Sequence, residues 1–87
     1  MLDGFSETML ENGYFDAGDG VWCRAVPHPQ AGEVALVAMF RDGEQLFWEQ
    51  ERVNADVWGV LSADEQHDRL LAVKAVLWEM VSSVRGR

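Results

Sequence analysis

The dipeptide Asp42-Gly43 limits the fold of this chain more than any other feature, because it stands between two runs of strand-forming residues. Asp-Gly readily takes the positive φ values that both central residues of a type I′ turn need, and this turn joins antiparallel strands. We therefore predict a β-hairpin with strands over residues 33–41 and 44–53.

This register divides the side chains of the hairpin between two faces. The first face has apolar pairs between pairs of opposite charge: Arg41–Glu44, Met39–Leu46, Val37–Trp48 and Glu33–Arg52. Each such cross-strand pair stabilises a sheet by about 0.2–1 kcal/mol, so we predict that this face is the core side. The opposite face, with Phe47, Glu49 and Glu51, is then expected to point outward. Leu36 and Phe40 on that outward face would be covered by the first helix or exposed to a partner.

Turn and helix signals place the elements before the hairpin. An N-terminal helix that starts near residue 2 or residue 6 is expected to end around residue 12. Residues 13–20 are rich in glycine and aspartate and are predicted to form a turn. A third strand is predicted over residues 21–26, and it ends where Pro27 and Pro29 each remove a backbone donor.

The last third of the chain is predicted to be helical. Asn54 is a favourable N-cap for a short helix over residues 54–61. Ser62 and Glu65 have the spacing of a capping box, so a long C-terminal helix is expected to begin there. Acidic residues in its first turn and arginines at its end favour the helix dipole.

The long helix carries more apolar surface than one small sheet needs. Its main apolar stripe consists of Leu70, Val73, Leu77, Met80, Val81 and Val84. Leu71 and Trp78 lie outside this stripe, at about 100° and 80° from Leu70. They are expected to be covered either by the short helix, through Trp58, or by a second copy of the chain.

These elements predict one α+β domain over residues 1–87. It has a short N-terminal helix, a three-stranded antiparallel sheet, a short helix, and a long C-terminal helix packed on one face of the sheet. A single cysteine excludes an internal disulfide and fits a reducing compartment. Neither an apolar run of membrane-spanning length nor the pattern of a signal peptide occurs, so we expect a soluble cytoplasmic protein with no membrane partner.

Residues capable of chemistry are present, but their surroundings do not favour a reaction. Cys23 falls in the middle of a predicted strand with no base nearby in sequence, so it is expected to be buried and inert. Asp64 and His67 lie one helical turn apart, which supplies too few ligands for a metal. Glu49 and Glu51 share a strand face without an enclosed apolar surround. We therefore predict no enzyme activity, no cofactor site and no metal site.

Charge is the bulk property that most restricts function. The net charge is −8, with 14 acidic residues and three arginines before residue 69, and three net positive charges from residue 69 onward. Nucleic-acid affinity depends on neutralising phosphates with lysine and arginine, so this balance disfavours nucleic acid. It favours attraction to a basic protein surface, although acidity also serves solubility alone.

The function favoured by these features is that of a small acidic module that inhibits or neutralises a basic protein, for example one that binds nucleic acid. Immunity proteins, antitoxins and phage inhibitors have comparable size and charge. Such a module would present Glu44, Glu49 and Glu51 to an arginine- and lysine-rich surface, with Phe47 as its apolar anchor.

The alternative function is that of a homodimeric adaptor or chaperone-like assembly protein. In that case Leu71 and Trp78 of the long helix would form the self-association surface. A nucleic-acid-binding domain and a small enzyme are the least favoured functions, because the basic residues do not form a stripe and no catalytic motif is present.

Overall fold

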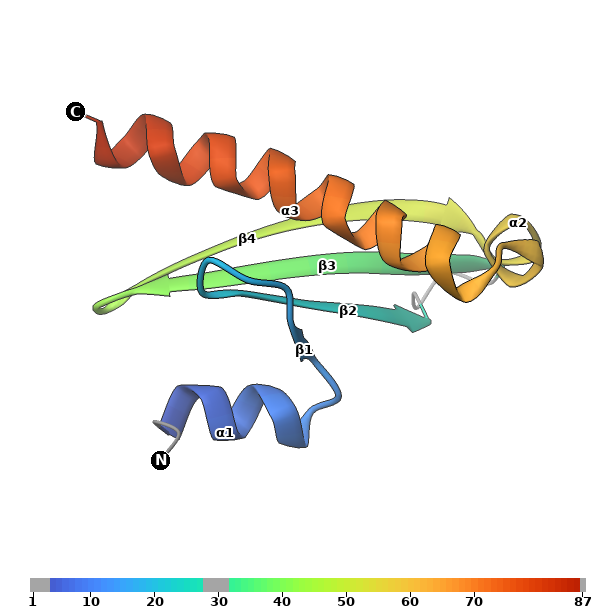
Figure 1. The fold of residues 1–87 in the computed structure, drawn as a ribbon, viewed down its shortest axis with the longest axis horizontal. Helices are drawn as coiled ribbons and strands as arrows, with labels where there is room; N and C mark the ends of the chain where they lie inside the picture. The colour runs from blue at the N-terminus through green and yellow to red at the C-terminus, as the bar shows by residue number, and fades with distance from the viewer. Residues whose placement is uncertain (1–3, 28–31, 87) are drawn as a thin grey trace.

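The fold places one long helix across a four-stranded sheet (Figure 1). It is taken from a computed structural model that describes residues 4–27 and 32–86. The elements follow in the order α1 (Gly4–Glu11), β1 (Phe15–Asp16), β2 (Val21–Pro27), β3 (Glu33–Asp42), β4 (Gln45–Asn54), α2 (Ala55–Val60) and α3 (Ala63–Arg85). The predicted helix start at residue 2 and the predicted strand break at Pro29 lie outside the described residues.

All four strands are antiparallel and stand in the sheet in their chain order, β1-β2-β3-β4. α3 crosses one face, which we call the α3 face, and α1 lies on the other side of the sheet, whose face we call the α1 face (Figure 1). The predicted α+β fold, with the long C-terminal helix packed on one face, is therefore confirmed. The difference is β1, a two-residue strand in the segment that was expected to form a turn.

The core lies between α3 and the α3 face of the sheet. Four buried residues of α3 recur at helical spacing: Leu70, Val73, Leu77 and Val81. They pack with buried residues of β2 and β3, namely Val21, Cys23, Leu36, Ala38 and Phe40. Phe47 and Val53 of β4 join this cluster as half-buried neighbours. Removal of this apolar surface from water is the main favourable term in folding.

The predicted choice of core face is wrong. α3 covers the face that carries Phe47, while Leu46 and Trp48 on the other face of β4 are exposed. The run of apolar residues in β3 occupies both faces, so the hairpin pattern alone does not select one. Arg24 and Arg41 interrupt the α1 face, which leaves the α3 face as the one that is apolar across β2, β3 and the turn-proximal end of β4.

The register of the hairpin is shifted by two residues from the prediction. The turn is centred on Gly43-Glu44, and Asp42 lies opposite Gln45. Gly43 has a φ of +62°, whereas Glu44 is not among the residues with positive φ. This is the pattern of a type II′ turn, which needs glycine at the first central position, rather than of a type I′ turn. A shift of two residues keeps every side chain on its predicted face.

The two charge pairs predicted at the ends of the hairpin have different outcomes. Arg52 is no longer directly opposite Glu33, but its Nε lies 3.4 Å from Glu33 Oε2, so the ion pair forms diagonally. Arg41 does not pair with Glu44. Its Nε instead donates a hydrogen bond of 2.8 Å to the carbonyl oxygen of Gly43 in the turn.

The α1 face is covered over β2 and the end of β3, and open over β4. The guanidinium of Arg41 lies 5.6 Å from the ring centroid of Phe5 in α1, and that of Arg24 lies 5.9 Å from the ring centroid of Tyr14. These cation–π contacts hold α1 and the following loop against the central strands. α1 has eight residues, and the α1 face of β4 keeps its apolar side chains exposed.

Both predicted helix caps are confirmed. Asn54 Oδ1 accepts hydrogen bonds from the backbone N–H groups of Asp56 at 2.8 Å and Val57 at 3.1 Å. Ser62 Oγ accepts from Glu65 N at 3.1 Å, and Glu65 Oε1 accepts from Ser62 N at 2.9 Å, which completes the capping box. These caps set the break between α2 and α3 within two residues.

The variants Val81→Ala and Val60→Ala test the placement of the core with the same chemical change. Val81 of α3 is fully buried, so its truncation should lower the free energy of unfolding by about 2–3 kcal/mol through lost transfer and a residual cavity. Val60 of α2 is 83% exposed, and its truncation should change stability by less than about 0.5 kcal/mol. Urea denaturation measures both values, and equal losses would contradict this core.

Candidate protein-binding site

β4 forms an open edge of the sheet. Within the described residues it pairs with β3 on one side and with no strand on the other. An edge strand presents unpaired N–H and C=O groups, which are suited to pairing with another polypeptide. β1 at the opposite edge has two residues, whereas β4 has ten. The β4 edge is therefore the long backbone surface that this fold leaves without a partner strand.

The backbone groups on this edge belong to the even-numbered residues of β4. Asp42 and Gln45 close the two-residue turn and form the first hydrogen-bonded pair, and bonding to β3 then alternates along the strand. By this alternation the N–H and C=O groups of Leu46, Trp48 and Gln50 point away from β3. The hydrogen bond of the Gln50 backbone N–H is consistent with this direction. The group donates at 3.3 Å to the adjacent carboxylate oxygen, Glu49 Oε1, rather than to β3.

Exposed apolar side chains flank this edge on the α1 face. Leu46 is 51% exposed and Trp48 is 55% exposed, and they are next to each other on one side of the strand. Met39 lies opposite Trp48 and is half-buried. Tryptophan is among the residues most often found as an energetic centre of protein interfaces.

A second apolar row flanks the same edge on α3. Val76, Met80 and Val84 are all exposed and follow one another at intervals of four residues, so they form one line on the helix. Arg69 lies seven residues before Val76, on the same side of the helix, and its Nη2 is 3.0 Å from Glu51 Oε1 of β4. At 100° per residue, Val76 and Met80 lie within about 20° of Arg69 around the helix, so these two face the β4 side of the molecule. Val84 lies about 60° from Arg69, in the direction of the buried Val73 and Leu77. We call the open edge of β4, with Leu46, Trp48, Val76 and Met80, the β4 surface.

The residues predicted to bind a basic partner do not form one outward face. Phe47 is half-buried against the core below α3, so its prediction as an exposed anchor is wrong. Glu51 is engaged in the ion pair with Arg69. Glu49 is half-buried on the same side of the sheet, and Glu44 is exposed in the turn. Of the four, Glu44 and Glu49 make no ion pair within the described residues.

The residues predicted for self-association are also placed differently. Leu71 and Trp78 are both half-buried, and Trp78 packs edge-on against Phe40 with ring centroids 5.3 Å apart. Trp58 of the short helix packs against the core cluster, and the ring that Trp78 contacts is that of Phe40 in β3. Met80 and Val84, predicted as part of the core stripe, are exposed instead.

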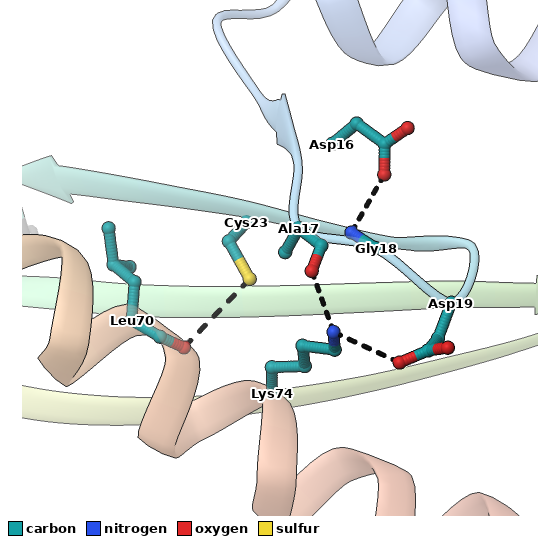
Figure 2. Close-up of polar contacts among 7 residues, drawn as sticks. All are labelled: Asp16, Ala17, Gly18, Asp19, Cys23, Leu70 and Lys74. Atoms are coloured by element: carbon teal, nitrogen blue, oxygen red, sulfur yellow. Dashed lines mark hydrogen bonds and ion pairs between the residues drawn. The ribbon is translucent and has the colours of Figure 1, made fainter.

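Most described basic residues are neutralised within the chain. Lys74 Nζ lies 3.1 Å from Asp19 Oδ2 and donates at 2.6 Å to the carbonyl oxygen of Ala17, so α3 is tied to the turn before β2 (Figure 2). Arg85 Nε lies 3.6 Å from Asp42 Oδ2 at the other end of α3. These contacts leave an excess of acidic side chains on the surface.

Cys23 has the environment of an inert thiol, as predicted. It is fully buried in β2, and its Sγ is 3.9 Å from the carbonyl oxygen of Leu70 (Figure 2). Burial raises the pKa of the Cys23 thiol from 9.0 to about 11, and the nearby positive charge of Lys74 opposes this rise. The thiolate, which is the nucleophile, is therefore strongly disfavoured at neutral pH.

Among the described residues, Glu65 has a structural role in the cap of α3. Two hydrogen bonds with Ser62 lower the pKa of Glu65, which serves the capping box. Across residues 4–27 and 32–86 there is no group of three or more histidine, cysteine or acidic side chains placed to hold a metal, and no pocket opens. The helices in this part of the chain are too short or too polar to span a bilayer.

Comparison of the chain with protein-family models, with curated proteins and with solved structures finds no match. The candidate site therefore depends on the geometry alone.

The reactivity of Cys23 tests its burial. At pH 8 a thiol reagent should modify the native protein only as fast as the protein unfolds, because the thiol is enclosed and protonated. The same reagent should react at once in denaturing urea. The variant Gln50→Cys, with a thiol at an exposed position of β4, is the positive control under native conditions. Immediate modification of the native wild type would contradict this placement.

Proposed function

We propose that this chain is a small acidic module that binds another polypeptide through the β4 surface. By this binding it inhibits or assembles its partner and does not catalyse a reaction. The observation that supports this most strongly is the exposure of Leu46 and Trp48 beside an open edge strand. A long exposed edge with bare apolar side chains is a liability for a protein without a partner. β4 carries charge at Glu49, Glu51 and Arg52, but its first half exposes Leu46 and Trp48.

The β4 surface combines the two components of strand addition. Its backbone groups supply hydrogen bonds that do not depend on sequence, and side chains on its two faces supply specificity. Trp48 would bury its ring on the α1 face while Val76 and Met80 contact the partner on the α3 face. Isolated exposed apolar residues are ordinary on protein surfaces, whereas apolar rows on both sides of one edge indicate an interface.

Charge favours a basic partner for the module. The chain has a net charge of −8, and Glu44 and Glu49 lie on or next to β4 without an ion pair in the described part of the chain. These carboxylates would steer a partner with exposed lysine and arginine toward β4, and the rate of association would fall with salt. Binding of this kind would neutralise a basic surface, which is how a small inhibitor acts.

The variant Trp48→Ser tests the apolar part of the proposal. Immobilised wild-type protein should retain a partner from an extract of its own cells. Trp48→Ser should bind that partner at least about 30-fold more weakly, since truncation of a tryptophan hot spot costs about 2 kcal/mol or more. Val60→Ser is the matched control, because Val60 is 83% exposed on α2 and lies outside the β4 surface. Equal loss of binding by both variants, or by neither, would contradict the assignment of this surface.

The double variant Glu44→Lys/Glu49→Lys tests the charge part. If the partner is basic, the variant should bind it more slowly than the wild type at low salt, and the difference should shrink at high salt. Glu7→Lys/Glu11→Lys on α1 changes the net charge equally at exposed positions away from β4 and is the control. Unchanged association of the β4 variant at low salt would remove the basic partner from the proposal.

A further inference from the structure

We propose that the occupant of the β4 surface is a second copy of this chain, with the two β4 strands paired antiparallel about a two-fold axis beside Trp48. This inference rests on the part of the proposed function in which the β4 surface binds a polypeptide. It names an acidic polypeptide in place of a basic one, so a self-paired chain would not have its β4 surface free for a basic partner. The pairing would join two four-stranded sheets into one continuous sheet.

The backbone of β4 allows this pairing. If Trp48 lies opposite Trp48 of the second copy, Leu46 lies opposite Gln50, and Gln50 lies opposite Leu46. All of these are even-numbered residues, whose N–H and C=O groups point to the open edge. Each of the three pairs can exchange two hydrogen bonds, as in an ordinary antiparallel ladder.

Charges along β4 select this register over its neighbours. A register centred on residue 49 places Glu49 directly opposite itself, and one centred on residue 50 places Glu49 opposite Glu51. Like charges in these positions destabilise a sheet. The register centred on Trp48 opposes no two acidic residues, and it brings Glu44 of each copy opposite Arg52 of the other. It is the longest register free of opposed glutamates, because a centre at residue 47 shortens the ladder.

The position of α3 agrees with the same centre. Arg69 of α3 is paired with Glu51, and Arg85 is paired with Asp42, which lies opposite Gln45. The midpoint of positions 51 and 45 on β4 is 48, and the midpoint of positions 69 and 85 on α3 is 77. Val76 is the exposed residue next to that midpoint, on the β4 side of the helix.

A two-fold axis at Trp48 therefore brings the two α3 helices together in antiparallel directions near Val76. Val76 would face its own copy, and Met80 would face the region of Ala72, a small exposed residue one turn before Val76. The two apolar rows of α3 would cover each other on the α3 face. The Trp48 side chains would meet on the α1 face. One axis accounts for both exposed rows.

This pairing has one unfavourable element, and it supplies a distinctive test. Glu49 of each copy would lie opposite Phe47 of the other, so the two Glu49 carboxylates would flank the axis, and no basic residue of β4 lies between them. Glu49→Gln keeps the shape of the side chain and removes the repulsion. This variant should tighten the dimer several-fold, whereas a change in a residue outside the interface would leave it unaltered.

The mass in solution is the first measurement. Sedimentation equilibrium of the wild type at about 100 μM should give twice the chain mass of 9.8 kDa, since a stable interface of standard size is populated well below that concentration. Val76→Glu should give the mass of one chain, because it would place two carboxylates at the axis. Val60→Glu introduces the same residue at an exposed site on α2 and should leave the dimer intact.

Cysteine cross-linking is the second measurement, and it is specific for the register. In a mixture of Leu46→Cys and Gln50→Cys chains, the introduced thiols face each other across the interface and should form a disulfide-linked heterodimer under mild oxidation. Either variant alone should not cross-link efficiently, because each new thiol is then opposite a non-cysteine residue. Cys23 does not interfere, since it is fully buried.

Each result decides the proposal. A dimer that Val76→Glu dissociates and that cross-links in the 46–50 mixture supports it. If the mass of the dimer is unchanged by Val76→Glu, or if each single cysteine variant cross-links as well as the mixture, this pairing is overturned. A monomer at about 100 μM overturns it as well, at a concentration where interfaces of standard size are populated. If that monomer still captures a basic protein in a Trp48-dependent manner, the self-pairing fails while the proposed binding function stands.

Discussion

The packing of α3 on the α3 face of the sheet determines the rest of this structure. Leu77 and Val81 are fully buried against Leu36 and Ala38, and the small alanine lets the helix approach the central strands closely. Ion pairs near both ends of α3 and at Lys74 fix its direction across the strands. Within the described residues α3 is the one long helix, and it covers the α3 face. The eight-residue α1 covers the α1 face over β2 and the end of β3 and leaves β4 open. The exposed rows beside β4 follow from this arrangement.

Local signals in the sequence predicted most of the fold. The caps at Asn54 and Ser62 depend on hydrogen bonds within a few residues, and both form as expected. The hairpin was found for the same reason, but its register was not, because Gly43 takes the first central position of the turn rather than the second. The core face was predicted wrongly since β3 is apolar on both sides. That choice depends on which side α3 meets, and no local pattern in β3 contains this information.

The candidate site was less predictable than the fold, because exposure depends on contacts distant in sequence. Phe47 and Trp48 are adjacent on one strand, and a pattern of alternation assigns them to opposite faces without saying which face is covered. On α3, Met80 and Val84 were expected in the core stripe and are exposed. Met80 lies at the margin of the buried positions, and Val84 lies beyond the last buried residue, Val81, near the end of the helix. The spacing of seven residues places Val76 on the same side of α3 as Arg69. The ion pair between Arg69 and Glu51 is what shows that this side faces β4, and the sequence does not predict that ion pair.

The central claim is that the open edge of β4 pairs with β4 of a second copy of the chain. Hydrogen exchange of individual backbone amides at two protein concentrations tests this directly. The amides of Leu46 and Trp48 point to the edge, so they should exchange freely in dilute solution and become protected as the concentration rises to about 100 μM, a level at which standard interfaces are populated. Amides of α2, away from the edge, should not change. Identical exchange of Leu46 and Trp48 at both concentrations would contradict the account.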